Sequence, residues 1–357
     1  MPYRDFFMEY PPGALAVFMP ATLFGQSHYN AAFKALMALC GVATLVLVAV
    51  VLIRLRASVA RLWLACAFVA LSPLALGPIS LNTYDAWSAL LTVAALAALI
   101  AGRETAALAV LGLAVATKVY PVVVLPAALV WTARRRGARA AWVGVSVFAA
   151  VALAVTLPFL VLAPHGLLES FRSQAARGLQ IESLGAQLLV ASHHVFGTGV
   201  AVAHHTRTAV TYDVRGTTAT LLGLAGSLFQ LAAVAAVAWF YARRDDGSRR
   251  LAVSFAAAVA GFLAFARFLS PQYLVWLVPL APFVPGVSAL AVLALALALD
   301  QVWFFHYRAI VQIGDRSWLV LSRDLLLVLL FVLVLRHAAK DEDSVVLEDE
   351  LPFRVPA

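Results

Sequence analysis

The 357-residue chain contains little charge and almost no cysteine. Asp, Glu, Lys and Arg make up 12% of the residues and hydrophobic residues 63%, whereas soluble domains are about 25% charged and about 45–50% apolar. A water-soluble globular protein of this length is therefore excluded. The two cysteines, Cys40 and Cys66, lie within apolar stretches, so we interpret them as small core residues and not as a disulfide or a metal pair.

The alternating short strands of membrane β-barrels are also missing from the sequence. Instead, several stretches of about 20 residues carry few or no charges, which is enough to cross about 30 Å of hydrocarbon as a helix. Because only helices and closed barrels satisfy their backbone groups in lipid, the sequence predicts an all-α fold, a polytopic membrane helical bundle. The net charge of +8 then belongs to cytoplasmic loops, and no nucleic-acid partner is expected.

Motifs for nucleotides and metals are absent as well. No glycine-rich phosphate loop occurs, which argues against a nucleotide-activated donor bound on the cytoplasmic side. The histidine pairs at 193–194 and 204–205 match no standard metal-ligand spacing. We therefore expect neither a metal nor a cofactor.

Arginines separate the apolar stretches and set the topology, since Lys and Arg concentrate in cytoplasmic loops. Clear apolar stretches cover residues 31–51, 62–76, 85–101, 105–131, 140–162, 217–241, 251–268 and 319–335. Basic clusters lie at 54–61, 103, 134–139, 243–250 and 336–340. We assign all of these clusters to the cytoplasmic side, which leaves residue 1 and the polar stretch 164–215 outside.

This assignment predicts broken membrane segments. The stretch 105–131 must return to the side from which it started, yet it is too short for two ordinary spans. We expect a re-entrant pair of short helices that turns near Lys118, because Pro121 cannot donate a helix hydrogen bond. The same reasoning predicts a short return helix over 274–283 and a span over 287–303. The predicted total is about ten to eleven helical membrane segments, including the short broken ones. Broken helices are tolerated where they line a protein cavity.

The topology divides the chain into five parts. They are an outer loop with an interfacial helix at 1–30, transmembrane helices at 31–163, an outer loop with an amphipathic helix at 164–215, transmembrane helices at 216–336 and an acidic cytoplasmic tail at 337–357. No apolar segment precedes Tyr3, although the topology places the N-terminus outside. We therefore expect that one transmembrane helix upstream of residue 1 is missing from the sequence.

Four motifs follow one another on the predicted outer side: YRDFFMEYPPG from Tyr3, ATKVYP around Lys118, RGLQIES from Arg177 and FLSPQYLVWLVP from Phe268. In this order they resemble the pattern of glycosyltransferase family 87, whose members have the GT-C architecture. The resemblance implies a transferase that passes a sugar, often mannose, from a polyprenyl phosphate to a lipid or glycan acceptor. It also implies contact with membrane lipids, a plasma-membrane location and an extracytoplasmic active site.

Two features depart from this pattern. GT-C enzymes usually have a catalytic aspartate in the first outer loop, soon after a first helix that this sequence lacks. The phosphatidylinositol mannosyltransferase branch carries a histidine pair after Ser-Pro, where this chain has Gln272 and Tyr273. The resemblance therefore does not specify the principal base or the acceptor.

Acidic residues at the N-terminus are the candidate catalytic base. An inverting transfer needs a carboxylate to accept the proton of the attacking hydroxyl, which contributes about 10²- to 10⁴-fold. Asp5 and Glu9 fit that role, with Arg4 as a sugar or acceptor contact. The alternative is that both carboxylates only pair with Arg4 or cap the helix that begins near Gly13.

A leaving phosphate needs cations and hydrogen-bond donors near the membrane surface. Lys118 is the first candidate, since a lysine inside an apolar hairpin is costly and marks function. Snorkelling to the headgroups is the alternative. The further candidates for binding the donor phosphate are Tyr120, Arg177, Arg267, Gln272 and Tyr273. Arg267 could instead be an interfacial anchor.

The sugar or acceptor contacts are predicted from the outer loop and from the start of a span. Gln180 and Glu182 could bind sugar hydroxyls, the alternative being a solvated loop. Asp85 could line the cavity or simply cap its helix. Asp300 could belong to a buried hydrogen-bonded pair or to a cavity wall. A lipid-linked sugar flippase and a truncated inactive homologue remain open as alternative functions.

Overall fold

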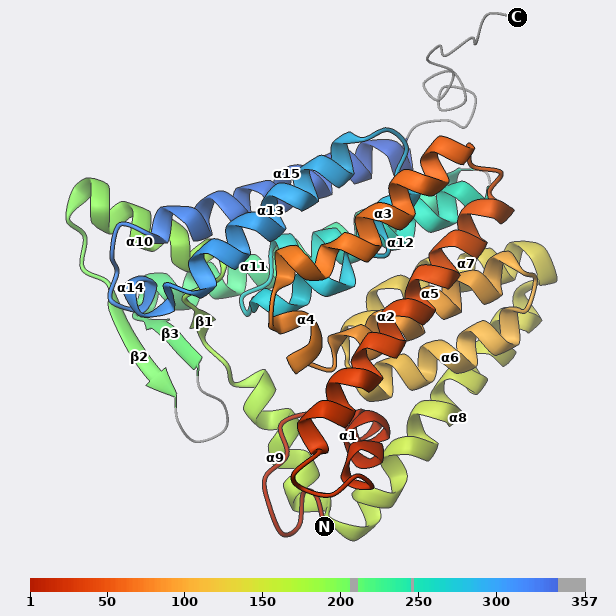
Figure 1. Cartoon of the computed structure of the whole chain (residues 1–357), viewed down its shortest axis with the longest axis horizontal. Coiled ribbons are helices and arrows are strands. Elements are labelled where there is room, and N and C mark those ends of the chain that lie inside the picture. The colour runs from red at the N-terminus through yellow and green to blue at the C-terminus, as the bar shows by residue number, and fades with distance from the viewer. Residues whose placement is uncertain (206–210, 245–246, 340–357) are drawn as a thin grey trace, which may run out of the picture.

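A computed structural model describes residues 1–205, 211–244 and 247–339. Within these ranges the chain forms a bundle of helices with one small sheet at its edge (Figure 1). Five of the described helices are long and apolar enough to cross a membrane: α2 (Tyr29–Arg54), α3 (Val59–Leu76), α8 (Ala138–Leu162), α11 (Thr217–Arg243) and α15 (Ser317–Ala339). The predicted all-α membrane bundle is confirmed. The predicted acidic tail lies almost wholly outside the described residues.

Shorter helices fill the centre of the bundle. They are α5 (Asp85–Ile100), α6 (Glu104–Thr117), α7 (Leu125–Arg136), α12 (Ser248–Ala264) and α13 (Ser288–Phe304). Fourteen of the 17 residues of α12 are buried, but only one of the 25 in α8. Helix α12 is therefore the centre of the core, whereas α8 presents its apolar side chains to lipid.

Helices α6 and α7 form a hairpin. Lys118 is extended, with φ −155° and ψ 134°, and the 3₁₀ helix η2 (Tyr120–Val124) then leads into α7. Pro121 lacks the amide hydrogen that would continue α6. Arg136 Nε lies 3.3 Å from Glu104 Oε2, so the end of α7 returns to the start of α6 and Lys118 lies at the turn.

The second broken segment differs from the predicted return helix. Residues 271–283 form two 3₁₀ helices, η3 (Pro271–Trp276) and η4 (Ala281–Phe283). Prolines at 271, 279, 282 and 285 remove the donors that an α-helix would need. Arg61 stabilises the following turn by donating to the carbonyls of Pro282, Val284 and Gly286.

The remaining short elements gather at one end of the bundle. They include η1 (Pro12–Ala14), α1 (Leu15–Thr22), α4 (Ile79–Asn82), α9 (Pro164–Ala175), α10 (Leu184–Phe196) and α14 (Tyr307–Val311). Strands β1 (Leu179–Gln180), β2 (Ala201–His205) and β3 (Thr211–Arg215) form an antiparallel sheet in the order β1-β3-β2. The sequence did not predict this sheet, because strands of two to five residues show too little alternation to be recognised.

The two ends of the bundle differ in character. The arginine-bearing C-terminal ends of α2, α7 and α11 lie toward the upper right of Figure 1, opposite the N-terminus, α9 and the sheet. Trp63, Trp142 and Trp239, close to these helix ends in sequence, are at least half exposed. Exposed tryptophans next to arginines are typical of a membrane interface.

Gly13 allows the N-terminal segment to dock beside Lys118. A Cβ atom at this position would lie 2.7 Å from the carbonyl carbon of Ala116 and 2.8 Å from the amide nitrogen of Thr117. We expect Gly13→Ala to destabilise the protein by about 1–3 kcal/mol, as overpacking does, which lowers the thermal unfolding midpoint in detergent. Gly41, whose Cβ would meet nothing within 4 Å, supplies the matched control Gly41→Ala, which should be neutral or slightly stabilising. Equal midpoints would contradict this docking.

Candidate functional site

Lys118 forms a buried ion pair at the turn between α6 and η2. Its Nζ lies 2.5 Å from Oδ1 of Asp85, and the side chains are 12% and 1% exposed. The indole Nε1 of Trp276 donates to the same oxygen at 2.5 Å. Asp85 therefore does not cap α5 with its side chain; it holds Lys118. The ammonium faces a carboxylate inside the protein, so snorkelling does not explain this lysine.

Aromatic rings surround the ammonium group. Nζ lies 4.6 Å from the ring centroid of Tyr84 and 5.0 Å from those of Tyr273 and Trp276. Tyr120 stacks on Trp276 at 3.8 Å, while its hydroxyl lies 2.9 Å from Oγ1 of Thr92. These rings stabilise a cation by their negative faces and keep water from the ion pair.

A second ion pair joins the N-terminal segment to the outer loop. Arg177 pairs with Oε1 of Glu9, and the two side chains are 9% and 19% exposed. Gln174 Nε2 donates to the same carboxylate oxygen at 3.1 Å, and Ser170 Oγ donates to the Glu9 carbonyl at 3.2 Å. Helix α9 thus fixes the position of Glu9 and brings it to Arg177.

Aromatic contacts connect the two ion pairs. The guanidinium carbon of Arg177 lies 3.9 Å from the ring centroid of Phe268. The Phe268 ring is 5.9 Å from that of Tyr273, which stacks on Trp276 at 4.4 Å. Glu9 and the predicted phosphate ligands Arg177, Tyr273 and Lys118 therefore belong to one continuous cluster. We call it the outer cluster: Glu9, Asp85, Lys118, Arg177, Phe268, Tyr273 and Trp276.

Other predicted residues lie outside the outer cluster. Asp5 is half exposed and pairs with Arg4 at 2.8 Å and with the amine of Met1. The hydrogen bond from Arg4 lowers the pKa of Asp5 well below its ordinary value, which weakens it as a base. Arg267 Nη2 donates to the carbonyl of Ala175 at 2.7 Å, and Gln272 is half-buried.

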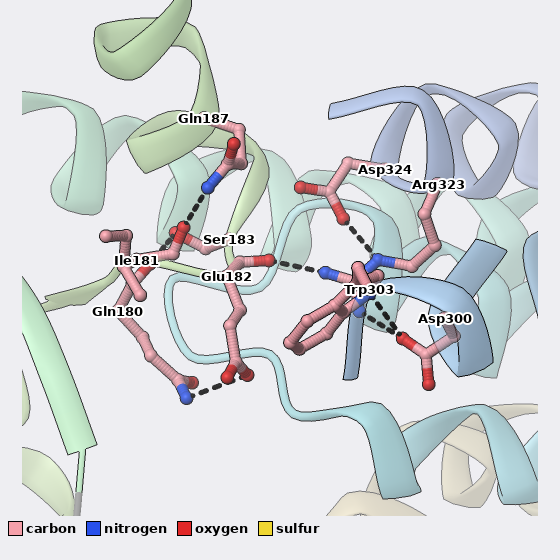
Figure 2. A network of polar contacts seen from close by, with 9 residues as sticks. All are labelled: Gln180, Ile181, Glu182, Ser183, Gln187, Asp300, Trp303, Arg323 and Asp324. Atoms are coloured by element: carbon pink, nitrogen blue, oxygen red, sulfur yellow. Dashed lines mark hydrogen bonds and ion pairs between the residues drawn. The ribbon is translucent and has the colours of Figure 1, made fainter. Parts of the chain in front are cut away.

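Gln180 and Glu182 lie in a buried polar network, and the alternative of a solvated loop is wrong for both. They are 2% and 3% exposed, and Gln180 Nε2 donates to Glu182 Oε2 at 3.1 Å. Arg323 Nη2 donates to the Glu182 carbonyl at 2.6 Å. Figure 2 shows nine residues of this network, which also include Ile181, Ser183, Gln187, Asp300, Trp303 and Asp324.

Comparison with known proteins identifies the family. The profile of glycosyltransferase family 87 matches residues 7–266. The chain belongs to glycosyltransferase family 87. This family 87 enzyme is also similar to the crystal structure of ArnT from Cupriavidus metallidurans bound to undecaprenyl phosphate. The TM-score is 0.46, at 16% identity over 93% of this chain and 68% of that chain. No curated protein sequence matches it significantly.

Sequence reasoning missed several residues of the family 87 enzyme. Tyr84 and Trp276 face Lys118, but nothing in the sequence distinguishes them from the other aromatic residues of membrane segments. Arg323 and Asp324 could have been recognised, because two charges inside the apolar stretch 319–335 are costly in lipid. In the described parts of the chain, no group of three or more His, Cys, Asp or Glu side chains could hold a metal ion.

Burial raises the pKa of Glu182 to about 8 from an ordinary value of 4.5, against the opposing attraction of Arg323. The folded protein therefore holds this proton more tightly than the unfolded chain. The resulting stability is complete below about pH 4.5 and is lost as the pH rises towards 8. We expect the thermal midpoint to fall from pH 6 to pH 8.5 and Glu182→Gln to flatten that slope. If the thermal midpoint of the variant depended on pH as steeply as that of the wild type, the pH dependence would not come from Glu182.

Proposed function

We propose that the family 87 enzyme transfers a sugar, with mannose as the first to test, from a polyprenyl phosphate to a lipid or glycan acceptor. The reaction would take place on the outer side of the plasma membrane. The observation that supports this proposal is the ion pair between Glu9 and Arg177, connected by aromatic rings to Lys118. A carboxylate and two cations thus belong to one cluster, joined by aromatic rings.

The cations suit a leaving phosphate. In the transfer, the bond between the anomeric carbon and the phosphate oxygen breaks, and the electron pair stays on that oxygen. Lys118 and Arg177 would stabilise the charge that develops there, and they act more strongly because buried rings exclude water. Asp85 would orient Lys118 through their 2.5 Å contact.

Glu9 suits the base. The acceptor hydroxyl attacks the anomeric carbon from the opposite face, its oxygen forms the new bond, and its proton passes to the carboxylate, which gives inversion. In the free enzyme Glu9 is engaged by Arg177. A phosphate that binds Arg177 would compete for this contact and release the carboxylate. Asp5 remains the second candidate, but it is half exposed and lies outside the outer cluster, whereas Glu9 is largely buried beside the cation Arg177, which favours Glu9.

The surroundings of Glu9 suit a lipid substrate. A groove of about 490 Å³ opens beside it, and most of its wall is apolar. The wall is formed by Pro2, Phe6, Phe7, Met8, Glu9, Tyr10, Leu15, Phe18, Met19, Thr22 and Tyr29. An isoprenoid or acyl chain could lie here with its polar end at the ion pair. Gln180 and Glu182 stay candidates for sugar hydroxyls, with Arg4 as an acceptor contact and Tyr120, Arg267 and Gln272 as weaker phosphate ligands.

A transfer assay tests the proposal. The enzyme is reconstituted in lipid nanodiscs with envelope lipids as acceptors and with polyprenyl phosphates that carry labelled mannose or other sugars. We expect a labelled lipid product and free polyprenyl phosphate, and no product from nucleotide-activated mannose. Movement of the donor across proteoliposome membranes without transfer would instead identify a flippase. Transfer from the nucleotide sugar alone would overturn the proposed donor.

A further inference from the structure

Arg323 is a fully buried arginine whose three donor groups all have partners. From α15, Nη1 contacts Asp300 Oδ1 at 2.8 Å and Nε contacts Asp324 Oδ1 at 2.9 Å. Asp300 lies on α13 and also accepts from Trp303 Nε1 at 3.1 Å. The third donor reaches out of the helices to the carbonyl of Glu182 at 2.6 Å. Figure 2 shows the guanidinium between these partners.

Stability alone does not account for this arrangement. Arg323, Asp300 and Asp324 are at most 1% exposed, and removing charges from water costs several kcal/mol per ion. Apolar residues of similar volume are often neutral or stabilising in place of a buried ion pair. Charged groups inside membrane helices generally mark function. The network therefore needs a role, and the hydrogen bond from Arg323 to the Glu182 carbonyl in the outer loop indicates where that role lies.

The outer-loop segment is held from both sides. On one side, the amide of Gly178 donates to Asp213 Oδ2 of β3 at 3.1 Å, and that of Gln180 donates to the carbonyl of Arg267, after α12, at 3.0 Å. On the other side, Arg323 donates to the Glu182 carbonyl, two residues before α10 begins. The residue that precedes this fixed segment is Arg177.

We propose that Arg323, clamped by Asp300 and Asp324, is a positioning residue that fixes segment 177–182 and thereby presents Arg177 to the substrate phosphate. The proposal rests on the function proposed above. Five residues of extended chain span at most about 17 Å, and the hydrogen bonds of Gly178 and Gln180 lie between the two ends. We therefore expect a shift of the Glu182 carbonyl to change the position of this short segment and of Arg177. The carboxylates of Asp300 and Asp324 fix the orientation of the planar guanidinium, whose remaining N–H donor then fixes the Glu182 carbonyl. A lysine ammonium has no such fixed donor directions and cannot make the same set of contacts.

Arg323→Lys tests the proposal, because it keeps the charge and loses the fork. We expect the KM for the polyprenyl-phosphate donor to rise about tenfold and the acceptor KM to change less than twofold. Arg316→Lys is the matched control, since Arg316 is exposed just before the same helix. In an Arg177→Ala background, Arg323→Lys should add no further increase in donor KM. If the double variant instead showed the product of the two single-variant increases in donor KM, the positioning role would be overturned.

Hydrogen exchange gives a readout that does not need activity. Amides of residues 178–187 should exchange faster in Arg323→Lys than in the wild type or in Arg316→Lys, and unchanged exchange would overturn the proposal. If the wild type transfers nothing from polyprenyl phosphates, the proposed function fails while the exchange result still stands. Asp324→Asn, which weakens one contact only, should show a smaller shift in the same amides and replaces Arg323→Lys if that variant does not fold.

Discussion

Replacing Lys118 and Asp85 together, as Lys118→Met with Asp85→Asn, is expected to lower the kcat for sugar transfer about 10²- to 10³-fold. That is the usual cost of removing one preorganised group that stabilises developing charge. The double change is needed because Lys118→Met alone leaves a carboxylate buried and unpaired, which destabilises a protein by about 3–5 kcal/mol. The amide oxygen introduced by Asp85→Asn can still accept the hydrogen bond from Trp276, so the double variant should fold. Turnover of the polyprenyl-phosphate donor by detergent-purified enzyme measures the effect.

Two control variants sharpen this prediction. Lys34 is exposed on α2, so Lys34→Met removes one positive charge without touching the outer cluster and should leave kcat unchanged. Asp85→Asn alone keeps the ammonium but removes its anionic partner, so it should lower the thermal midpoint, while the kcat of the folded fraction falls less than in the double variant. If the double variant turned over within threefold of the wild type, Lys118 would not bind the leaving phosphate.

Much of the fold follows from charge and proline in the sequence. Arginine clusters indicated which helix ends share a side, and Pro121 marked the turn that carries Lys118. The segment after Pro271 was harder to predict. Its hydrophobicity suggested a helix, whereas repeated prolines left only 3₁₀ turns. Hydrophobicity indicates that a segment lies within the membrane. Whether that segment forms an α-helix depends on its backbone N–H donors, which proline lacks.

The site could be predicted in part for a related reason. Lys118 was recognisable because a charge in an apolar hairpin is conspicuous in the sequence. Its partner Asp85 lies 33 residues earlier, at a helix start where a cap explains it equally well. The tertiary contact at 2.5 Å decides between these roles. Gln180 and Glu182 looked solvated for the same reason, since the buried Arg323 that contacts their segment lies about 140 residues further along the chain.

Glu9→Gln should separate catalysis from binding in the outer cluster. Glutamine keeps the shape and can still contact Gln174, but it cannot accept a proton, so we expect kcat to fall about 10²- to 10⁴-fold. The donor KM should fall as well, because Arg177 no longer pairs with a carboxylate and is free for the phosphate. A lower kcat together with a lower KM indicates that a competing ground-state interaction was removed. Steady-state kinetics with varied donor measure both constants.

Asp5→Asn distinguishes Glu9 from its neighbour as the base. Asp5 is exposed and paired with Arg4, so its loss should change kcat less than threefold and leave the donor KM unchanged. A large loss in Asp5→Asn with little effect of Glu9→Gln would move the base to Asp5 and give Glu9 a structural role beside Arg177. The simultaneous fall of kcat and donor KM expected for Glu9→Gln cannot come from a loosened N-terminal segment. Loosening the contact with α9 would raise the donor KM as kcat falls.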